Sequence, residues 1–366
     1  MKNTSKGKNV FFSIVAFVIG FIASYLFVAP TILNPTSINI AVNATDLEIN
    51  FMMLGNKENG DSIYIKAGET DVLVDAGSTA ESGKTIKNYL FDSNSNHGYV
   101  SDNKLEYVIA THDDSDHIAS FTGSDGILTD KNIQVETIIE FAQTNKTTQV
   151  YKRYRQAVDD LKASGTKVYT ALECYKNQNG AQRIIELSEG IELEILYNYY
   201  YENKTSDEND YSVCFMLRRG NEQYLFTGDL ESSGEKHLVS NNNLGEVYLY
   251  KMGHHGSKTS STRLLLNVIK PKVVVATCNA FYNQYDAKPE NVFPTKTAIE
   301  NLVAVGSVEH FYVPVMTSDN EQGFVPANGN IVIKSNDNGT YVECSVTNKD
   351  FFDFEIFKQY RSWSSN

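Results

Sequence analysis

The sequence predicts an α/β (α+β) protein in which β-sheets are covered by helices, preceded by an N-terminal transmembrane helix. Short apolar runs typical of strands alternate with helical patterns along most of the 366 residues. The first three strand-like runs, 47–54, 62–66 and 71–75, are separated only by glycine-containing turns, which favours consecutive hairpins. Early hairpins followed by interleaved strands and helices favour covered sheets over a simple doubly wound parallel fold.

The transmembrane helix is predicted by residues 10–29, which are apolar and carry no charge. About 20 such residues are enough to cross a bilayer. Three lysines and no acidic residue precede them, so the positive-inside rule leaves the N-terminus in the cytoplasm and the rest outside. A cleaved signal peptide is the alternative, but residues 28–30 form a poor cleavage site. The expected organisation is a cytoplasmic N-terminus (1–9), a membrane anchor (10–30), a linker (31–46), one large domain (47–346) and a C-terminal tail (347–366).

The remaining elements follow in order. A helix is expected at about 81–91, and the strand 105–110 comes next. Later strands are expected at 135–141, 167–171, 191–197, 212–218, 223–227, 246–252, 272–277 and 310–315, and helices at about 148–163, 262–269 and 295–305. Two more strand-like runs lie beyond residue 328, before an aromatic tail at 351–354. Packing on the domain, contact with the membrane and contact with a partner all remain open for that tail.

Composition limits the classes of function. The net charge of −13 argues against a broad basic surface that follows a nucleic-acid backbone, although metal ions could supply positive charge locally. The four cysteines are far apart and form no C-x-x-C pair, so a thiolate zinc site is not expected. They are better interpreted as small buried apolar side chains.

Three polar clusters follow predicted strands and carry the chemistry. They are H-D-D-S-D-H at 112–117, T-G-D at 227–229 and G-H-H-G-S at 253–257. Each alone has a simpler explanation: a lone aspartate such as Asp229 is usually a turn or cap residue, and an acidic run can be a calcium loop. The acidic run lacks the glycine and glutamate of an EF-hand, and four of the seven histidines fall in two of the clusters. Since imidazole and carboxylate suit zinc, manganese or iron, the clusters together predict a metal site.

These motifs resemble the metallo-β-lactamase fold. T-H-x-D-x-D-H, then F-T-G-D-L-E, then K-M-G-H-H-G-S-K-T-S-S resemble most closely the domain attached to bacterial competence (ComEC-type) DNA-uptake proteins. They are also similar to the pneumococcal phosphorylcholine esterase domain. The resemblance covers about residues 47–346 and implies a four-layered αβ/βα sandwich with two divalent metal ions, zinc or manganese, along one edge of its sheets.

The resemblance also implies roles for individual residues. His112 and Asp114 would face one metal, Asp116 and His117 the other, Asp229 would bridge them, and His255 would complete the second site. His254 and Asp114 are the candidate proton donors, although the roles within the histidine pair could be reversed. Asn209 and Ser257 would contact substrate. Asp75, in L-V-D-A-G, would not bind metal itself but would orient the loop that carries the first group of metal ligands.

Two positions depart from related sequences. Asp114 stands where many hydrolases have histidine. A carboxylate is a harder metal ligand than imidazole, so this substitution favours manganese. Phe293 stands where this branch often has histidine before proline. The expected function is that of a membrane-anchored extracellular phosphodiesterase of a bacterial cell, using metal-activated water on a nucleic-acid, choline-phosphate or glycerol-phosphate substrate. The alternatives are a metallohydrolase of an ester, lactone or amide, and a non-catalytic metal-binding or interaction protein, which Phe293 favours.

Overall fold

A computed structural model of the chain describes residues 46–94, 97–282, 288–318 and 323–362. The expected cytoplasmic N-terminus, the anchor at 10–30 and all but the last residue of the linker lie outside the described residues. Within the described part, no helix combines the length and the apolar character needed to cross a bilayer.

The first sheet begins with hairpins and continues with parallel strands. In spatial order its strands are β18 (Gly339–Cys344), β17 (Ile331–Asn336), β1 (Leu47–Phe51), β2 (Ile63–Ala67), β3 (Thr70–Val74), β4 (Lys104–Ala110), β5 (Gln134–Glu140) and β6 (Lys167–Thr170). Neighbours are antiparallel from β18 to β3 and parallel from β3 to β6. The early hairpins predicted from the sequence are confirmed, and the two C-terminal strands join the sheet beside β1.

The second sheet repeats this order of pairing. Its strands are β14 (His310–Tyr312), β12 (Val273–Val275), β11 (Leu249–Lys251), β10 (Glu222–Phe226), β9 (Phe215–Arg219), β8 (Ile191–Ile195) and β7 (Ile184–Ser188). Pairing is antiparallel from β7 to β10 and parallel from β10 to β14. A smaller sheet contains β13 (Asn279–Ala280), β15 (Val315–Thr317) and β16 (Phe324–Pro326).

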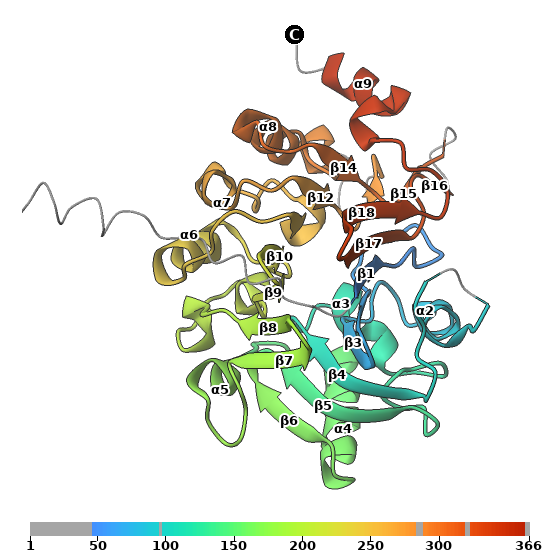
Figure 1. Ribbon diagram of the computed structural model, residues 1–366, viewed down its shortest axis with the longest axis vertical. Helices are drawn as coiled ribbons and strands as arrows, with labels where there is room; N and C mark the ends of the chain where they lie inside the picture. Colours follow the sequence, from blue (N-terminus) through green and yellow to red (C-terminus); the bar gives the residue numbers. More distant parts are fainter. Residues whose placement is uncertain (1–45, 95–96, 283–287, 319–322, 363–366) are drawn as a thin grey trace, which may run out of the picture. The chain divides into compact units, whose positions relative to one another are not determined.

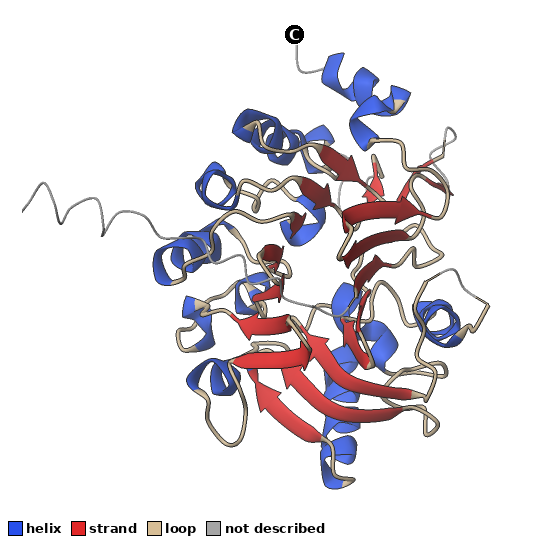
Figure 2. Cartoon of the chain, in the orientation of Figure 1, coloured by secondary structure: helices blue, strands red, loops and turns tan. Residues whose placement is uncertain are grey.

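The two large sheets pack face to face, and helices cover their outer faces (Figure 2). Alternation along the strands produces this packing, because successive side chains point to opposite faces. In β9, Phe215 and Leu217 belong to the core between the sheets, whereas Met216 belongs to the core under the helices of the second sheet. Phe51 of β1 and Phe226 of β10 meet across the sheets with ring centroids 6.4 Å apart. The result is an αβ/βα sandwich of two mixed sheets.

The helices seen in Figure 1 include each of those predicted. They are α2 (Ser82–Phe91), α3 (Ser115–Ile118), α4 (Gln149–Ala163), α5 (Ala171–Lys176), α6 (Ser232–Asn241), α7 (Arg263–Ile269), α8 (Lys296–Val305) and α9 (Glu355–Ser362). Thr148, Thr262 and Thr295 cap α4, α7 and α8, each accepting a hydrogen bond from a backbone N–H of the first turn.

The aromatic tail packs on the domain. Phe351, in the short 3-10 helix η6 (Phe351–Asp353), is buried with its ring centroid 5.7 Å from Phe311 and 5.8 Å from Phe281. Of the three possibilities for residues 351–354, packing on the domain therefore holds. Elsewhere in the core, the cysteines are free thiols, and three of the four are buried.

Candidate metal centre

Four side chains from both sheets converge where strands of the two large sheets end. His117 lies in α3, directly after β4 of the first sheet, and Asp61 precedes β2 of the same sheet. Asp229 follows β10, and His255 lies in the 3-10 helix η4 (Gly253–Gly256) after β11, both in the second sheet. Ends of neighbouring parallel strands meet at one edge of a sheet, and the contact between the sheets brings the two edges together.

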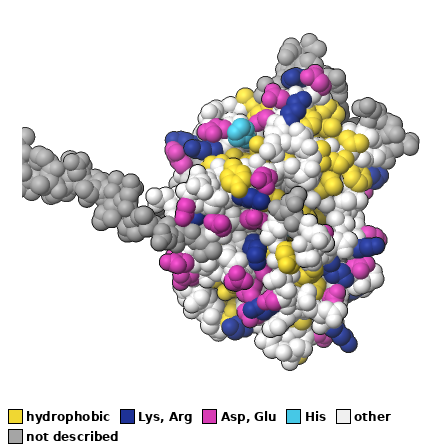
Figure 3. Space-filling model, turned by 45° about the vertical axis from the view of Figure 1, so that its right-hand side comes forward, with side chains coloured by type: hydrophobic (Ala, Val, Ile, Leu, Met, Phe, Trp, Pro, Cys, Tyr) yellow, Lys and Arg dark blue, Asp and Glu magenta, His cyan; other side chains and the backbone are white. Residues whose placement is uncertain are grey.

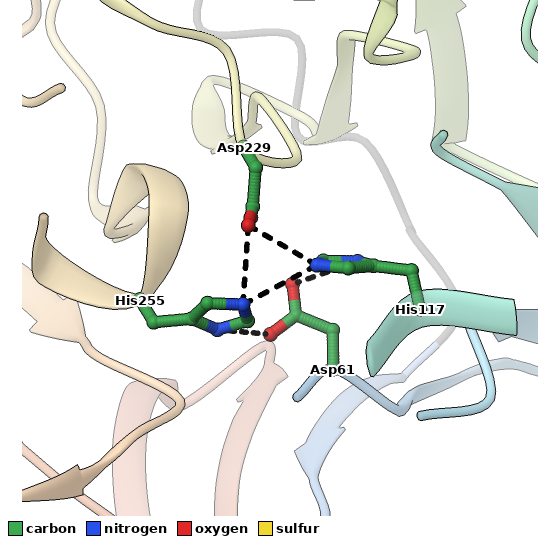
Figure 4. Close-up of side chains that lie close together, drawn as sticks. All are labelled: Asp61, His117, Asp229 and His255. Carbon is green, nitrogen blue, oxygen red and sulfur yellow. Dashed lines mark hydrogen bonds and ion pairs between the residues drawn. The ribbon is translucent and has the colours of Figure 1, made fainter. Parts of the chain in front are cut away.

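The converging atoms are close enough to share one cation. Nε2 of His117 and Nε2 of His255 each lie 3.1 Å from Oδ2 of Asp229, and they lie 3.3 Å from one another (Figure 4). With Asp61, these residues form a buried group whose possible ligand atoms all lie within 4.8 Å of one another. Neutral imidazole and carboxylate are typical ligands of divalent transition metals.

Both histidines are held through their other ring nitrogen. Nδ1 of His117 lies 2.8 Å from Oδ2 of Asp75, and Nδ1 of His255 lies 3.0 Å from the carbonyl oxygen of Thr277. Because these partners accept hydrogen bonds, both Nδ1 atoms carry a proton, and each Nε2 is the ring atom that faces the site, where a ligand would bind. Asp75 also accepts hydrogen bonds from the Thr111 N–H and hydroxyl, both at 2.7 Å. This is the position behind the ligands that the sequence predicts for Asp75.

Asp61 is the member of the group that the three sequence motifs do not contain. It lies on the Nδ1 side of the histidines, with Oδ1 3.3 Å from Nδ1 of His255 and Oδ2 3.8 Å from Nδ1 of His117. The carboxylates of Asp229 and Asp116 face the Nε2 side, and Oδ2 of Asp116 lies 3.5 Å from Nε2 of His255. The one sequence signal for Asp61 is a lone carboxylate next to an apolar strand.

The electrostatic state of the group suits a cation. Burial raises the pKa of Asp229, but His255, His117 and Lys251 outweigh it and hold that pKa well below its ordinary value. Burial likewise raises the pKa of Asp116, and its hydrogen bond to His255 and its attraction to His117 reverse the shift. Both carboxylates are therefore ionised and available as ligands at neutral pH.

His112 carries an unpartnered buried atom. Burial, with a smaller contribution from His117, lowers the pKa of His112 to about 4, so its ring is neutral at physiological pH. Its Nδ1 lies 3.1 Å from the Thr111 hydroxyl, whereas its buried Nε2 has no hydrogen-bond partner among the described residues. The ring centroids of His112 and His117 are 4.1 Å apart. An orphaned imidazole nitrogen beside a buried His–Asp group fits a metal ligand.

Asp114 stands apart from the group. Its Oδ1 lies 2.5 Å from Nζ of Lys146, and its side chain is 30% exposed. The structure thus brings His117, Asp116, Asp229 and His255 together and places His112 beside them, while Asp114 is paired with a lysine. The division into two metal sites stays a prediction.

The second histidine of the pair faces a different set of partners. Nδ1 of His254 lies 3.2 Å from Oε1 of Glu231, 3.2 Å from the Thr259 hydroxyl and 3.5 Å from Nδ2 of Asn209. The side chain of His254 is 19% exposed, and the ring of Phe293 lies 6.1 Å from it. His255 is therefore the inward-facing residue of the pair, and His254 lies at the rim of the site.

The rim also contains Ser257 and two residues that were not predicted as site residues, Thr259 and Glu231. The Ser257 hydroxyl lies 2.9 Å from the Thr259 hydroxyl and is not directed at the buried group. Glu231 follows Asp229 by two positions, and Nδ2 of Asn209 donates a hydrogen bond to its Oε1 at 3.3 Å. The sequence signal that could have identified Glu231 as a site residue is its position close to the motif aspartate Asp229.

Comparison with known proteins agrees with the geometry. Residues 55–138 match the metallo-beta-lactamase superfamily. Recombination protein 2 of Haemophilus influenzae is 30% identical over 107 residues, which cover 28% of this chain and 13% of that protein. Competence protein ComA of Neisseria gonorrhoeae is 35% identical over 106 residues, which cover 28% of this chain and 15% of that protein. The chain thus spans less than a sixth of the length of either relative.

Solved structures with a similar arrangement are distant in sequence. The metallo-beta-lactamase fold protein YhfI from Bacillus subtilis is 12% identical with a TM-score of 0.42, covering 79% of this chain and 99% of that protein. CmlA, a diiron beta-hydroxylase from Streptomyces venezuelae, is 12% identical with a TM-score of 0.35, covering 63% of this chain and 44% of that protein.

Proposed function

We propose that the chain is a metal-dependent hydrolase that cleaves phosphodiesters outside the cell membrane, and the match of residues 55–138 to the metallo-beta-lactamase superfamily supports the hydrolase class. The observation that carries the proposal is the convergence of two imidazole Nε2 atoms on Oδ2 of Asp229, with both Nδ1 atoms held by acceptors. That arrangement supports the binding of a divalent ion.

The proposed centre holds two ions, zinc or manganese. His117, His255, Asp229 and Asp116 would hold one of them. His112, through its unpartnered Nε2, and Asp229 would hold the other, with Asp114 joining them once it leaves Lys146. When bound, such ions supply Lewis-acid activation of water and neutralise charge on phosphoryl oxygens.

The chain's own residues do the remaining work. His254 presents its ring at the rim with Nδ1 held by Glu231, so Nε2 is the atom that would protonate the leaving oxygen. Asn209 contacts both of these residues and would fix a substrate oxygen beside them. The Phe293 ring near His254 excludes water from that side of the rim and takes the place of a further polar group.

The phosphodiester class is supported by the resemblance to competence-protein and phosphorylcholine esterase domains. The names of the partial relatives, a recombination protein and a competence protein, point to nucleic acid. On the face drawn in Figure 3, lysine and arginine side chains are interspersed with acidic ones, and no basic stripe runs across it. With a net charge of −13, this favours short or small phosphodiesters, such as choline- or glycerol-phosphate groups, over long duplex DNA.

The proposed location is a bacterial cell membrane, with residues 10–30 as a single-pass anchor and the domain at 47–346 outside the cell. The length of the uncharged run and the lysines before it support this topology. Protease added to intact cells would degrade the domain if the topology is correct and would leave it intact if the orientation is reversed.

The enzymatic proposal is tested with the full-length chain in detergent. We would remove metal with a chelator, add back manganese or zinc, and follow cleavage of bis(p-nitrophenyl) phosphate by the wild type and by Asp229→Asn. Asp337→Asn is the matched control, because Asp337 is 71% exposed and pairs only with Arg219. We expect turnover that requires metal, falls by at least about 10²-fold in Asp229→Asn, and is unchanged in Asp337→Asn.

Other results would redirect the proposal. Metal-dependent cleavage of an ester, lactone or amide without phosphodiester cleavage would support a different hydrolase. A folded protein that binds metal and cleaves none of these bonds would support the non-catalytic alternative. Equal activity in Asp229→Asn and the wild type would remove the proposed centre as the site of reaction.

A further inference from the structure

A lysine is buried directly beneath the candidate metal centre. Lys251 is the last residue of β11, an otherwise apolar strand, and its side chain is only 1% exposed. Its Nζ lies 2.5 Å from Oδ2 of Asp61, 3.2 Å from Oδ1 of Asp229 and 3.0 Å from the carbonyl oxygen of Gly228. These three acceptors match the three hydrogens of an ammonium group.

The contacts of Lys251 connect the two sheets at the site. Asp61 precedes β2 in the first sheet, whereas Lys251 ends β11 and Asp229 follows β10 in the second. Lys251 thereby occupies Oδ1 of Asp229 and leaves Oδ2, the atom that faces both histidine Nε2 atoms, directed into the site. A carboxylate whose two oxygens have different fixed partners cannot rotate freely, so the direction of its remaining lone pairs is set before any ligand arrives.

Burying a lysine is costly, and in a protein interior it requires good partners. Desolvation disfavours an isolated buried ammonium group, and removing one member of a buried ion pair leaves the other member unpaired. Here two buried carboxylates, of Asp61 and Asp229, share one lysine. A simple packing role would be met by an apolar residue such as those preceding it in β11, so the charge itself requires an explanation.

We propose that Lys251 is a positioning residue that acts as a resident cation of the metal centre. It holds Asp61 and Asp229 in place and partly balances their charge, so Oδ2 of Asp229 is directed at the two histidine Nε2 atoms before a divalent ion binds. This inference rests on the metal centre of the proposed function. In this proposal, the Lys251 ammonium group supplies the part of the positive charge around Asp61 and Asp229 that bound metal does not supply.

The inference predicts a dependence on metal that a packing role does not. In Lys251→Met, Asp61 and Asp229 lose their shared cation, and a divalent ion bound at Asp229 would restore positive charge beside them. The variant should therefore lose more stability in chelator than in the presence of metal. A residue that serves only packing would lose the same stability in both conditions, because its contacts do not involve the ion.

The experiment measures the thermal unfolding of the full-length chain in detergent, in chelator and in saturating manganese or zinc. Wild type, Lys251→Met and Leu249→Ala are compared, since Leu249 is a fully buried core residue of the same strand. We expect the Tm of Lys251→Met to fall by about 10 °C in chelator and by less than half as much in metal. Leu249→Ala should lose the same number of degrees in both conditions.

A second variant keeps the test decisive if Lys251→Met does not fold. The double variant Lys251→Met/Asp61→Asn removes one charge of each sign, so it should fold and regain part of the Tm lost in chelator. Equal losses for Lys251→Met with and without metal, or a double variant no more stable than the single one, would overturn the proposal. A wild-type chain whose Tm does not rise with metal would instead overturn the metal centre, and the proposal with it.

Discussion

Replacing Asp75 by asparagine exchanges a single oxygen for an amide nitrogen at a fully buried position behind His117. Asp75 accepts three hydrogen bonds, two from Thr111 and one from Nδ1 of His117. In the variant, the amide oxygen can stay with the Thr111 N–H, and the new NH2 group then faces His117. Because an NH2 group donates, Nδ1 of His117 must become the acceptor, and the ring proton moves to Nε2. That is the atom that faces Asp229 and that would bind the metal.

The size of the effect follows from the bond that is lost. A hydrogen bond to a charged group contributes about 1.5–3 kcal/mol, and a metal must displace the misplaced proton at a similar cost. Since about 1.4 kcal/mol is tenfold in affinity, metal binding should weaken by about 10- to 100-fold. The opposite amide orientation gives a similar cost, because the NH2 group would then face the buried Thr111 N–H.

The assay is competition for manganese or zinc between the protein and a chromogenic chelator. Asp71→Asn is the matched control: Asp71 lies in β3, the strand that Asp75 directly follows, is also buried, and pairs with Tyr64 and Lys66, away from the centre. We expect Asp71→Asn to lower stability while leaving metal affinity unchanged. A folded Asp75→Asn that binds metal within about threefold of the wild type would refute the proposed role of the histidine tautomer.

Two further predictions concern glutamates near the rim. Glu231→Gln should slow cleavage of an alkyl phosphodiester by about 10²-fold, because its carboxylate holds His254 for proton donation. A nitrophenyl substrate, whose leaving group needs no proton, should be slowed far less, and equal slowing of both substrates would argue against proton donation by His254. Glu235 is fully buried and accepts hydrogen bonds from the backbone N–H groups of Ser261 and Thr262. Burial raises the pKa of Glu235 from 4.5 to about 7, so its contribution to stability is complete below pH 4.5 and is lost as the pH rises through 7. The 2.5-unit difference corresponds to about 3 kcal/mol, so urea unfolding should show the stability advantage of wild type over Glu235→Gln shrinking by up to that amount between pH 5 and 8. A constant difference across this range would contradict the raised pKa.

Much of the fold could be predicted because its strands are short, apolar and bounded by turn residues. The limits of prediction are visible at α6, whose ten residues have three buried positions, of which Gly234 has no side chain and Glu235 is acidic, so they lack a clear apolar stripe. The strand expected from Ser212 begins at Phe215, because the Ser212 hydroxyl turns toward the site and accepts a hydrogen bond from the Asp229 N–H. Local pattern cannot reveal that competing contact.

The residues of the candidate site likewise fall into those that the sequence identifies and those that it does not. His117, Asp229 and His255 lie in compact motifs after strands, so residue type predicted a metal site there, while the individual roles came from the resemblance and the choice between His254 and His255 stayed open. Asp61 lies in no such motif, and Lys251 opens the motif K-M-G-H-H-G-S-K-T-S-S without a role that the motif assigns to it. Their importance arises from contacts between residues far apart in sequence, and only the packing of one sheet against the other creates those contacts. Asp114 shows the opposite case, in which a motif residue pairs with a lysine outside every motif.

The position of the centre between two sheets has a consequence for the lifetime of the protein. An ion held by His117 and His255 would cross-link positions 138 residues apart, joining halves of the sandwich that share no strand. Such a cross-link opposes the first separation of the sheets, which is the step that exposes the core to proteases. The supply of metal would then determine how long each molecule survives, as well as whether it can react.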